Sequence, residues 1–195
     1  KEESKYLMNM IDQHANRSMV VGSGKEMNEY NNARTSYTAN LIANDPTVES
    51  LHKKIAKYLG QPLKKGESLQ GQRYEVDQYF NDHVDYFSGD QYDKNCLSSG
   101  NRTWTFMLYL NDNFSGGATH FRHLNKRIIP ESCKAVAWNN LQNGYPNEYM
   151  LHSGMKVTSG TKYIITSWWR ENVWNGGEDA KEYQKKLKSN QLSII

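Results

Sequence analysis

A histidine and an aspartate stand two residues apart in the stretch NDHVDYF, residues 81 to 87. Successive side chains of a β-strand point to opposite faces, so a strand through this stretch would aim His83 and Asp85 in one direction. An imidazole and a carboxylate that converge on one point form either a hydrogen-bonded pair or two ligands of a metal ion. The short His-x-Asp pattern does not separate these interpretations, and a metal site requires a third ligand.

His152 is the best candidate for that third ligand. It lies in the stretch EYMLHSGMKVTSGTKYIITSWWR, where we expect a strand to end at His152, turns to follow, and a strong strand to run from Lys162 to Arg170. The other histidines lie either in predicted helices or three residues apart, on opposite faces of a strand: His14, His52, His120 and His123.

Two imidazoles and one carboxylate are the set that binds non-haem Fe(II) on one triangular face and leaves other positions open for chemistry. Zinc uses the same ligand types, so the set alone does not select the metal. Lys162, ten residues after His152, favours iron, because its ammonium can pair with the far carboxylate of a dicarboxylate co-substrate that chelates the metal at its other end. The alternative is that Lys162 extends to solvent from the start of its strand.

The pattern of helix and strand signals predicts one domain that is mainly β with supporting helices. In NDPTVESLHKKIAKYLG, Asp45 is a helix cap, Pro46 suits the first turn and Gly60 ends the helix. A second helix is expected from Tyr6 to His14. After Gly66, short runs rich in Tyr, Trp, Thr, Val and Ile alternate with turn residues, which is typical of a β-sandwich or jelly roll.

We therefore expect helical support from residues 1–65, a strand core from 66–172 and a charged helical tail on the surface from 173–195. The strongest strand signal is RTWTFMLYL, which has one apolar face and one face that carries hydroxyl groups. The apolar face holds Trp104, Phe106, Leu108 and Leu110, and the other holds Thr103, Thr105, Met107 and Tyr109. The polar stretch 86–101 has the length of a loop without structure of its own, and its place beside the ligands favours a lid.

Several ordered motifs resemble the prolyl 4-hydroxylase catalytic domain of the 2-oxoglutarate and Fe(II) dependent oxygenases, of the single-chain type found in algae, bacteria and large viruses. The match extends from about Arg34 to Arg170. It includes RTS at 34 to 36, ESLQGQRYEVDQYFNDHVDYF, RTWTFMLYLND followed by GGATHF, and LHSGMKVTSGTKYIITSWWR. The resemblance implies a double-stranded β-helix, or jelly-roll, core supported by N-terminal helices.

The resemblance also implies roles for individual residues. It assigns iron to His83, Asp85 and His152, and the distal carboxylate of 2-oxoglutarate to Lys162. The lining of the co-substrate pocket is implied to be Tyr74, Thr105, Tyr109 and Trp168, which composition alone would make ordinary core residues or strand positions. Glu67 and Arg102 match positions near the peptide substrate in relatives, and both are also ordinary charges for strand ends.

One position departs from the family pattern. Relatives commonly carry a tyrosine three residues before the first iron ligand, whereas this chain has Phe80 there and Tyr79 beside it. Either a hydroxyl on the substrate side is missing or the strand is shifted locally. The departure bears on substrate contacts and leaves the three iron ligands intact.

The implied activity is hydroxylation of peptidyl proline to 4-hydroxyproline, with Fe(II), 2-oxoglutarate, dioxygen and ascorbate as cofactors and co-substrates and with release of succinate and carbon dioxide. The implied partner is a proline-rich or collagen-like peptide. Two alternatives stay open: an oxygenase that acts on another protein side chain, a free amino acid or an alkylated base, and a jelly-roll binding module without catalysis.

Bulk composition narrows the class of partner. The 195 residues are 37% hydrophobic and 23% charged, and their formal net charge of +3 is far from the basic stripe of a nucleic-acid binder. No apolar run has the ~20 residues of a membrane span. The chain begins KEESKYLMNM, so we expect a processed or trimmed N-terminus and assign no compartment. Cys96 and Cys133 are expected to be buried thiols or a single bridge.

Overall fold

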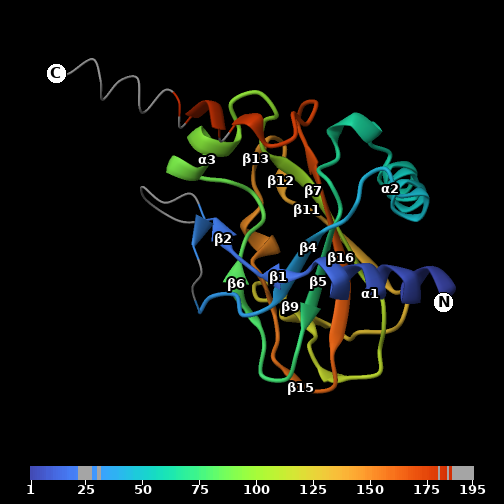
Figure 1. Cartoon of the computed structure of the whole chain (residues 1–195). Helices are drawn as coiled ribbons and strands as arrows, with labels where there is room; N and C mark the ends of the chain where they lie inside the picture. The colour runs from blue at the N-terminus through green and yellow to red at the C-terminus, as the bar shows by residue number, and fades with distance from the viewer. Residues whose placement is uncertain (22–27, 30–31, 180, 184, 186–195) are drawn as a thin grey trace.

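Two β-sheets form the core of the computed structural model, which describes residues 1–21, 28–29, 32–179, 181–183 and 185 (Figure 1). The larger sheet has six strands in the order β1-β4-β5-β16-β7-β11, and the smaller has four in the order β10-β9-β14-β6. Every strand pair within both sheets is antiparallel. This is the jelly-roll core that the sequence predicts.

The larger sheet consists of β1 (Asn16–Arg17), β4 (Tyr37–Asn40), β5 (Gln70–Tyr74), β16 (Lys162–Arg170), β7 (Arg102–Tyr109) and β11 (Ala135–Asn139). The smaller sheet consists of β10 (Lys126–Ile128), β9 (Thr119–Phe121), β14 (His152–Gly154) and β6 (Phe80–His83). Three two-stranded pairs are β2 (Val20–Val21) with β3 (Asn28–Glu29), β8 (Ser115–Gly116) with β15 (Val157–Ser159), and β12 (Leu141–Gln142) with β13 (Tyr145–Pro146). The helices are α1 (Glu2–His14), α2 (Pro46–Leu59) and α3 (Asp90–Asn95), with 3-10 turns η1 (Leu63–Lys65) and η2 (Glu148–Met150).

Helices α1 and α2 support the larger sheet on its outer face (Figure 1). The ends of α2 are those that the sequence predicts, because the Asp45 carboxylate accepts from the backbone N–H groups of Thr47 and Val48 and Gly60 adopts the left-handed conformation. Helix α1 begins four residues before the predicted start. It packs so closely on β5 that a Cβ on Gly71 would lie 2.3 Å from Ile11, so this contact requires glycine.

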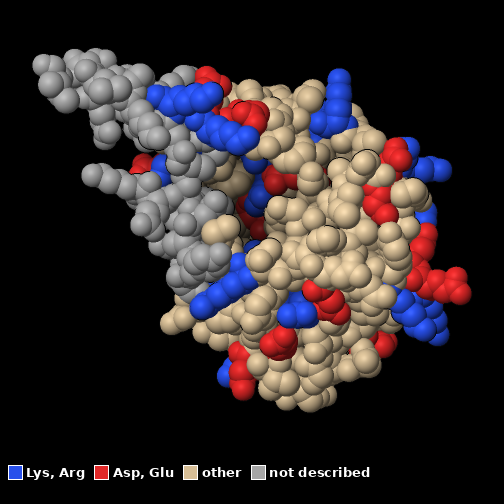
Figure 2. Space-filling view, in the orientation of Figure 1, with Lys and Arg blue, Asp and Glu red and all other residues tan. Residues whose placement is uncertain are grey.

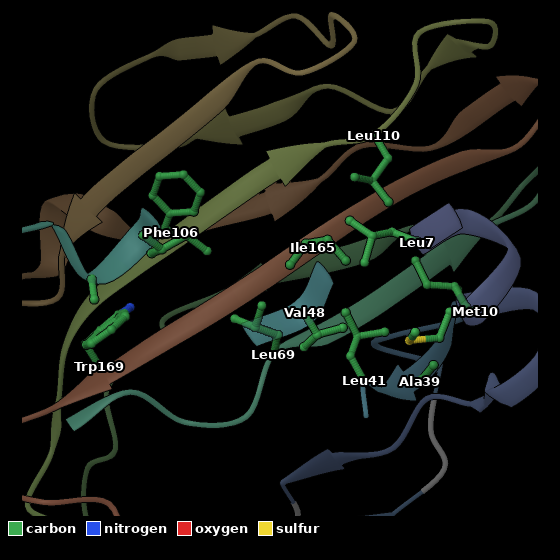
Figure 3. Close-up of a cluster of buried hydrophobic side chains, with 13 residues drawn as sticks. Leu7, Met10, Ala39, Leu41, Val48, Leu69, Phe106, Leu110, Ile165 and Trp169 are labelled. Carbon is green, nitrogen blue, oxygen red and sulfur yellow. The ribbon is translucent and has the colours of Figure 1, made fainter. Parts of the chain in front are cut away.

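Two apolar clusters occupy the two faces of the larger sheet. One cluster joins α1 and α2 to the sheet and includes Leu7, Ile11, Ile55, Phe106 and Trp169 (Figure 3). The second fills the space between the sheets and includes Tyr74, Met107, Tyr109, Trp138 and Ile164. Strand β7 contributes alternate residues to the two clusters, which confirms the two faces predicted for RTWTFMLYL.

The structure differs from the sequence expectations at several element boundaries. Residues 1–65 contain the two expected helices, but β1 and β4 from this region also extend the larger sheet beside β5. Stretch 86–101 holds α3 and therefore has structure of its own. Strand β14 begins at His152, where the sequence suggested that a strand ends, because His152 pairs with His83 and Phe121 on its two sides.

Most of the described tail residues are exposed, as expected for a surface segment, but one residue of the tail is buried. Asp179 is only 2% exposed, and its carboxylate accepts from the backbone N–H groups of Ser98 and Ser99 and from the Ser98 hydroxyl. Helical backbone is present at residues 178, 179, 181–183 and 185, and the rest of the predicted tail helix lies outside the described residues. The tail thus tethers the end of stretch 86–101.

Cys96 is buried and Cys133 is exposed, and both are free thiols, so the possible bridge is absent. None of the helices in the described ranges has the length and apolar character needed to cross a membrane.

Candidate metal and co-substrate site

His83, Asp85 and His152 converge at one end of the smaller sheet. His83 is the last residue of β6 and lies opposite His152 on β14, while Asp85 follows two residues beyond the end of β6. The Nε2 atoms of His83 and His152 lie 3.7 and 3.9 Å from the two carboxylate oxygens of Asp85. One ligand atom from each residue lies within 4.8 Å of the other two. A single metal ion can therefore contact all three.

Both imidazoles are oriented by the backbone. Nδ1 of His83 is 2.8 Å from the carbonyl oxygen of Asn81, and Nδ1 of His152 is 2.8 Å from that of Met150. A carbonyl can only accept, so each Nδ1 carries the proton and each Nε2 presents its lone pair to the centre of the cluster. Burial and the neighbouring His152 lower the pKa of His83 to about 3, which keeps it neutral.

Asp85 is held ionised by its surroundings. Burial opposes ionisation, but the charge of Arg102 and the hydrogen bond from the Thr105 hydroxyl keep the pKa of Asp85 below its usual range. The Thr105 hydroxyl donates to Oδ2 of Asp85 at 2.7 Å and accepts from Nδ2 of Asn140 at 2.8 Å. A donor chain from the core thus orients the carboxylate that a cation would need.

Aromatic rings surround the imidazoles. Phe80 stacks on His83 with centroids 3.6 Å apart and planes 16° apart, and Trp138 meets His152 edge-on at 4.7 Å. Phe80, which stands where relatives carry tyrosine, therefore faces the metal-ligand cluster from within β6. No hydroxyl reaches the cluster from this position.

Lys162 closes the far end of the adjoining cavity. Only 1% of Lys162 is exposed, so its side chain is buried, and the alternative that it extends to solvent is wrong. Its Nζ donates to the carbonyl oxygen of Gly117 at 2.7 Å and lies 5.0 and 5.4 Å from the ring centres of Tyr74 and Tyr109. Desolvation lowers the pKa of Lys162 to about 7. Among the described residues, no carboxylate pairs with it.

The lining of this cavity is rich in unpaired hydrogen-bond donors. Nε2 of Gln72 and the indole nitrogens of Trp138 and Trp168 are buried and have no hydrogen-bond partner in the part of the chain that the structure describes, and all three residues line the cavity with Lys162. The only carboxylate in the lining is Asp85. Buried donors without acceptors are costly, so the cavity suits a ligand rich in acceptor oxygens. A dicarboxylate such as 2-oxoglutarate meets this requirement, and the three ligands at the other end suit a divalent metal.

The structure brings most of the predicted pocket residues together, in two layers. Tyr74 and Trp168 line the cavity directly. Thr105 and Tyr109 lie behind it: Thr105 bonds Asp85, and the Tyr109 hydroxyl lies 2.7 Å from that of Thr119, whose side chain reaches the lining. Sequence reasoning missed Thr119 and Gln72, because neither carries a charge or a metal-binding group that would mark it.

A groove of about 850 Å³ opens outside the metal-ligand cluster. Arg34, Phe80 and Trp168 line both the groove and the inner cavity, and Arg102 lines the groove. The guanidinium of Arg34 lies 4.9 Å over the Phe80 ring and donates to the hydroxyls of Ser36 and Thr38. The RTS motif at 34 to 36 is the sequence signal for Arg34, and it does not by itself indicate a role for this residue.

Glu67 lies beneath this groove and bonds two arginines. Its Oε1 accepts from Nε of Arg102 at 2.7 Å and from Nε of Arg170 at 2.6 Å, and Oε2 accepts from Arg102 at 2.8 Å. Although burial opposes ionisation, both guanidiniums hold the pKa of Glu67 below its usual range. Arg102 in turn stacks at 4.0 Å on Trp168. Figure 2 shows charged side chains of both signs at the bottom of a hollow on this face.

A jelly roll that gathers two imidazoles and a carboxylate beside a donor-lined cavity ending in a buried lysine has the features of a non-haem metal oxygenase. Residues 69–170 match the family model of the 2OG-Fe(II) oxygenase superfamily. The chain belongs to this superfamily, as the sequence resemblance implied.

Similar proteins agree on this class. The chain is 36% identical over 150 residues to a putative prolyl 4-hydroxylase of Acanthamoeba polyphaga mimivirus, covering 74% of this chain and 61% of the relative. It is 29% identical over 191 residues to probable prolyl 4-hydroxylase 10 of Arabidopsis thaliana, covering 87% and 65%. The chain thus spans less than two thirds of the length of these curated relatives.

The fold also matches solved structures. The viral collagen prolyl hydroxylase of Paramecium bursaria Chlorella virus-1, in complex with 2-oxoglutarate, superposes with a TM-score of 0.67 at 22% identity, covering 87% of this chain and 90% of that one. A prolyl hydroxylase of Trichoplax adhaerens, in complex with a peptide fragment of the hypoxia inducible factor oxygen degradation domain, has a TM-score of 0.63 at 12% identity, covering 93% and 81%. At these identities the likeness concerns the fold.

Proposed function

We propose that this chain hydroxylates proline residues in peptides, with Fe(II), 2-oxoglutarate and dioxygen, and releases succinate and carbon dioxide. The observation that carries the proposal is the placement of three candidate metal ligands at one end of a donor-lined cavity and, at the other end, of a buried lysine that has no carboxylate partner among the described residues. This arrangement provides one anchor for each end of a five-carbon keto diacid.

In this proposal His83, Asp85 and His152 hold the iron. When bound, the iron supplies the redox chemistry that couples oxidative decarboxylation of 2-oxoglutarate to oxidation of a substrate C–H bond. The chain keeps both Nε2 lone pairs directed at the metal through the bonds from Nδ1 to backbone carbonyls. Thr105 keeps Asp85 oriented. Ascorbate is expected to keep the iron reduced.

Lys162 is the proposed partner of the distal carboxylate. Its ammonium is desolvated and lacks a counter-charge among the described residues, so a bound carboxylate would supply both the charge and a hydrogen-bond acceptor. Arg170, the other cation on this face of β16, is engaged by Glu67. On this face of β16, Lys162 is therefore the cation that remains available for the co-substrate among the described residues. Tyr74 and Trp168 line the same cavity and would exclude water around the pair.

The proposed substrate lies in the outer groove, which opens directly on the metal-ligand cluster. The groove offers an aromatic surface at Phe80 and Trp168 and hydrogen-bond donors at Arg34 and Arg102. An extended, polyproline-like peptide fits such a surface, because its backbone carbonyls are free to accept and its conformation is already ordered. The names of the relatives as prolyl 4-hydroxylases support the same class of substrate.

The test is mass spectrometry of proline-rich and collagen-like peptides after incubation with the protein, Fe(II), ascorbate and 2-oxoglutarate. We expect a mass gain of one oxygen on proline and an equal amount of succinate. Free proline, other side chains and alkylated bases serve as comparison substrates. Hydroxylation of one of these with no reaction on peptidyl proline would make the chain an oxygenase of another specificity. Absence of any iron-dependent succinate would favour a binding module.

A further inference from the structure

Gln72 is a fully buried amide in the wall of the co-substrate cavity, and neither the sequence motifs nor the proposed function gave it a role. It lies in the middle of β5 with 1% of the residue exposed. The Cα of the neighbouring residue Gly71 faces the opposite side of the sheet, where α1 packs against it. Gln72 and Tyr74 thus point the same way and both line the cavity that ends at Lys162.

The amide of Gln72 is satisfied at only one of its two ends. The Thr166 hydroxyl donates to Oε1 of Gln72 at 2.9 Å, which turns the NH₂ group away from Thr166. Nε2 is buried and has no hydrogen-bond partner among the described residues. A buried amide donor left unpaired is costly, so a protein retains one where a ligand or water completes it.

The strand register places this amide between the two anchors of the site. Gln72 of β5 pairs with Ile164 of β16. This pair lies two residues along the strands from the pair of Tyr74 with Lys162. Further along β16, Trp168 pairs with Thr105, which bonds the metal-ligand carboxylate of Asp85. The hydrogen bond from the Thr166 hydroxyl to Oε1 draws the Gln72 side chain toward that end of β16. A molecule that extends from Lys162 to the metal ligands therefore passes the Gln72 NH₂ group.

We infer that Gln72 donates a hydrogen bond from Nε2 to an oxygen of bound 2-oxoglutarate and that Thr166 is the positioning residue that holds the amide in this orientation. The inference rests on the proposed function, because it requires 2-oxoglutarate in this cavity. It makes Gln72 a further determinant of co-substrate affinity, separate from the lysine and from the metal ligands.

The test is titration of 2-oxoglutarate into Mn(II)-loaded protein by calorimetry, without peptide, so that binding is measured without turnover. The variants are Gln72→Leu, Thr166→Val and the double variant Gln72→Leu/Thr166→Val. Gln70→Leu is the matched control, because Gln70 lies on the same strand but its amide donates to Asn40 at 3.2 Å. Affinity for Mn(II) is measured for each protein in the absence of 2-oxoglutarate.

We expect Gln72→Leu and the double variant to bind 2-oxoglutarate roughly ten- to a hundredfold more weakly, since a hydrogen bond to a charged acceptor is lost. Thr166→Val should show a smaller loss, and Gln70→Leu should stay within about twofold of wild type. Mn(II) affinity should be unchanged throughout, since Gln72 is not among the metal ligands. A merely structural role for Gln72 would not weaken 2-oxoglutarate binding while Mn(II) affinity stays constant.

Thermal melting keeps the test valid if Gln72→Leu alone folds poorly. The double variant removes both partners of the buried hydrogen bond, so its melting temperature without ligand should be close to that of wild type, while the rise on adding 2-oxoglutarate should shrink. Wild-type affinity in both Gln72 variants would overturn the inference and leave the proposed function standing. Failure of the wild-type protein to bind 2-oxoglutarate would overturn both.

Discussion

The affinity for 2-oxoglutarate should fall as pH rises above 7, because Lys162, the proposed partner of the distal carboxylate, is desolvated. Burial lowers the pKa of Lys162 from 10.5 to about 7 in the free protein, and no carboxylate among the described residues raises it again. Binding of a dianion requires the ammonium form. At pH 7 about half of the molecules carry that charge, and at pH 8 about a tenth do.

This population sets the expected magnitude. The apparent dissociation constant should increase roughly fivefold from pH 7 to 8 and roughly fiftyfold from pH 7 to 9, with uptake of about 0.9 proton per 2-oxoglutarate bound at pH 8. The same shift has a consequence for stability. The unfolded chain keeps this proton up to about pH 10.5 and the folded protein releases it near 7, so the free energy of unfolding without ligand should rise with pH across that window.

The assay is calorimetry of the Mn(II)-loaded protein at pH 7, 8 and 9 in pairs of buffers with different enthalpies of ionisation, which gives affinity and proton uptake together. Lys162→Arg is the matched control, because a guanidinium stays charged throughout this range and its weaker binding should not change with pH. Burial raises the pKa of Tyr109 to about 12, so the nearby phenol does not titrate here. Equal affinity from pH 7 to 9 without proton uptake would show that Lys162 is already charged in the free protein and would refute the reasoning.

Three further changes test other parts of the site. Asp85→Ala should abolish hydroxylation and weaken Fe(II) binding, while circular dichroism shows that the fold is retained. Zn(II) should inhibit the wild-type protein, because zinc binds such ligands but has no redox chemistry. Full activity with Zn(II) alone would contradict the iron assignment. Glu67→Ala removes the carboxylate partner of two guanidiniums and should lower the free energy of unfolding by urea by about 3–5 kcal/mol. Glu67→Gln should lower it less. Equal stability of Glu67→Ala and wild type would show that solvent replaces the contacts from Glu67 to the two arginines. Asp179→Ala removes the acceptor for the backbone N–H groups of Ser98 and Ser99 and should speed limited proteolysis within 86–101. In the wild-type protein, a proline-rich peptide with 2-oxoglutarate should slow this cleavage. An unchanged cleavage rate in the variant would argue against the tether.

Local signals in the sequence were enough where neighbouring residues decide the structure. The cap at Asp45 and the stop at Gly60 give the bounds of α2, and both depend on backbone groups within a few residues. Alternation gives the two faces of β7, because the period of a strand is a property of its own backbone. The candidate metal ligands were predictable only as a set, because the His-x-Asp pair at 83 and 85 is ambiguous by itself and needed His152 and the ordered motifs around it.

Boundaries and partners that depend on distant segments were not predictable in the same way. Strand β6 ends at His83 and β14 begins at His152 because the two pair with each other across 69 residues of chain. The strands β1 and β4 form because β5 offers an edge. Burial of Asp179 depends on serines that lie about 80 residues away in the sequence.

By itself the sequence predicted the class of fold, the three candidate metal ligands and the lysine proposed to bind the co-substrate, from residue types, strand period and ordered motifs. Tertiary structure alone decided that, within the described ranges, Lys162 is buried without a carboxylate partner, Glu67 pairs with two arginines and the amide of Gln72 keeps a donor free. The physical reason is that burial and hydrogen-bond completion are set by the packing of strands far apart in the chain, and no local pattern records which polar group is left without a partner.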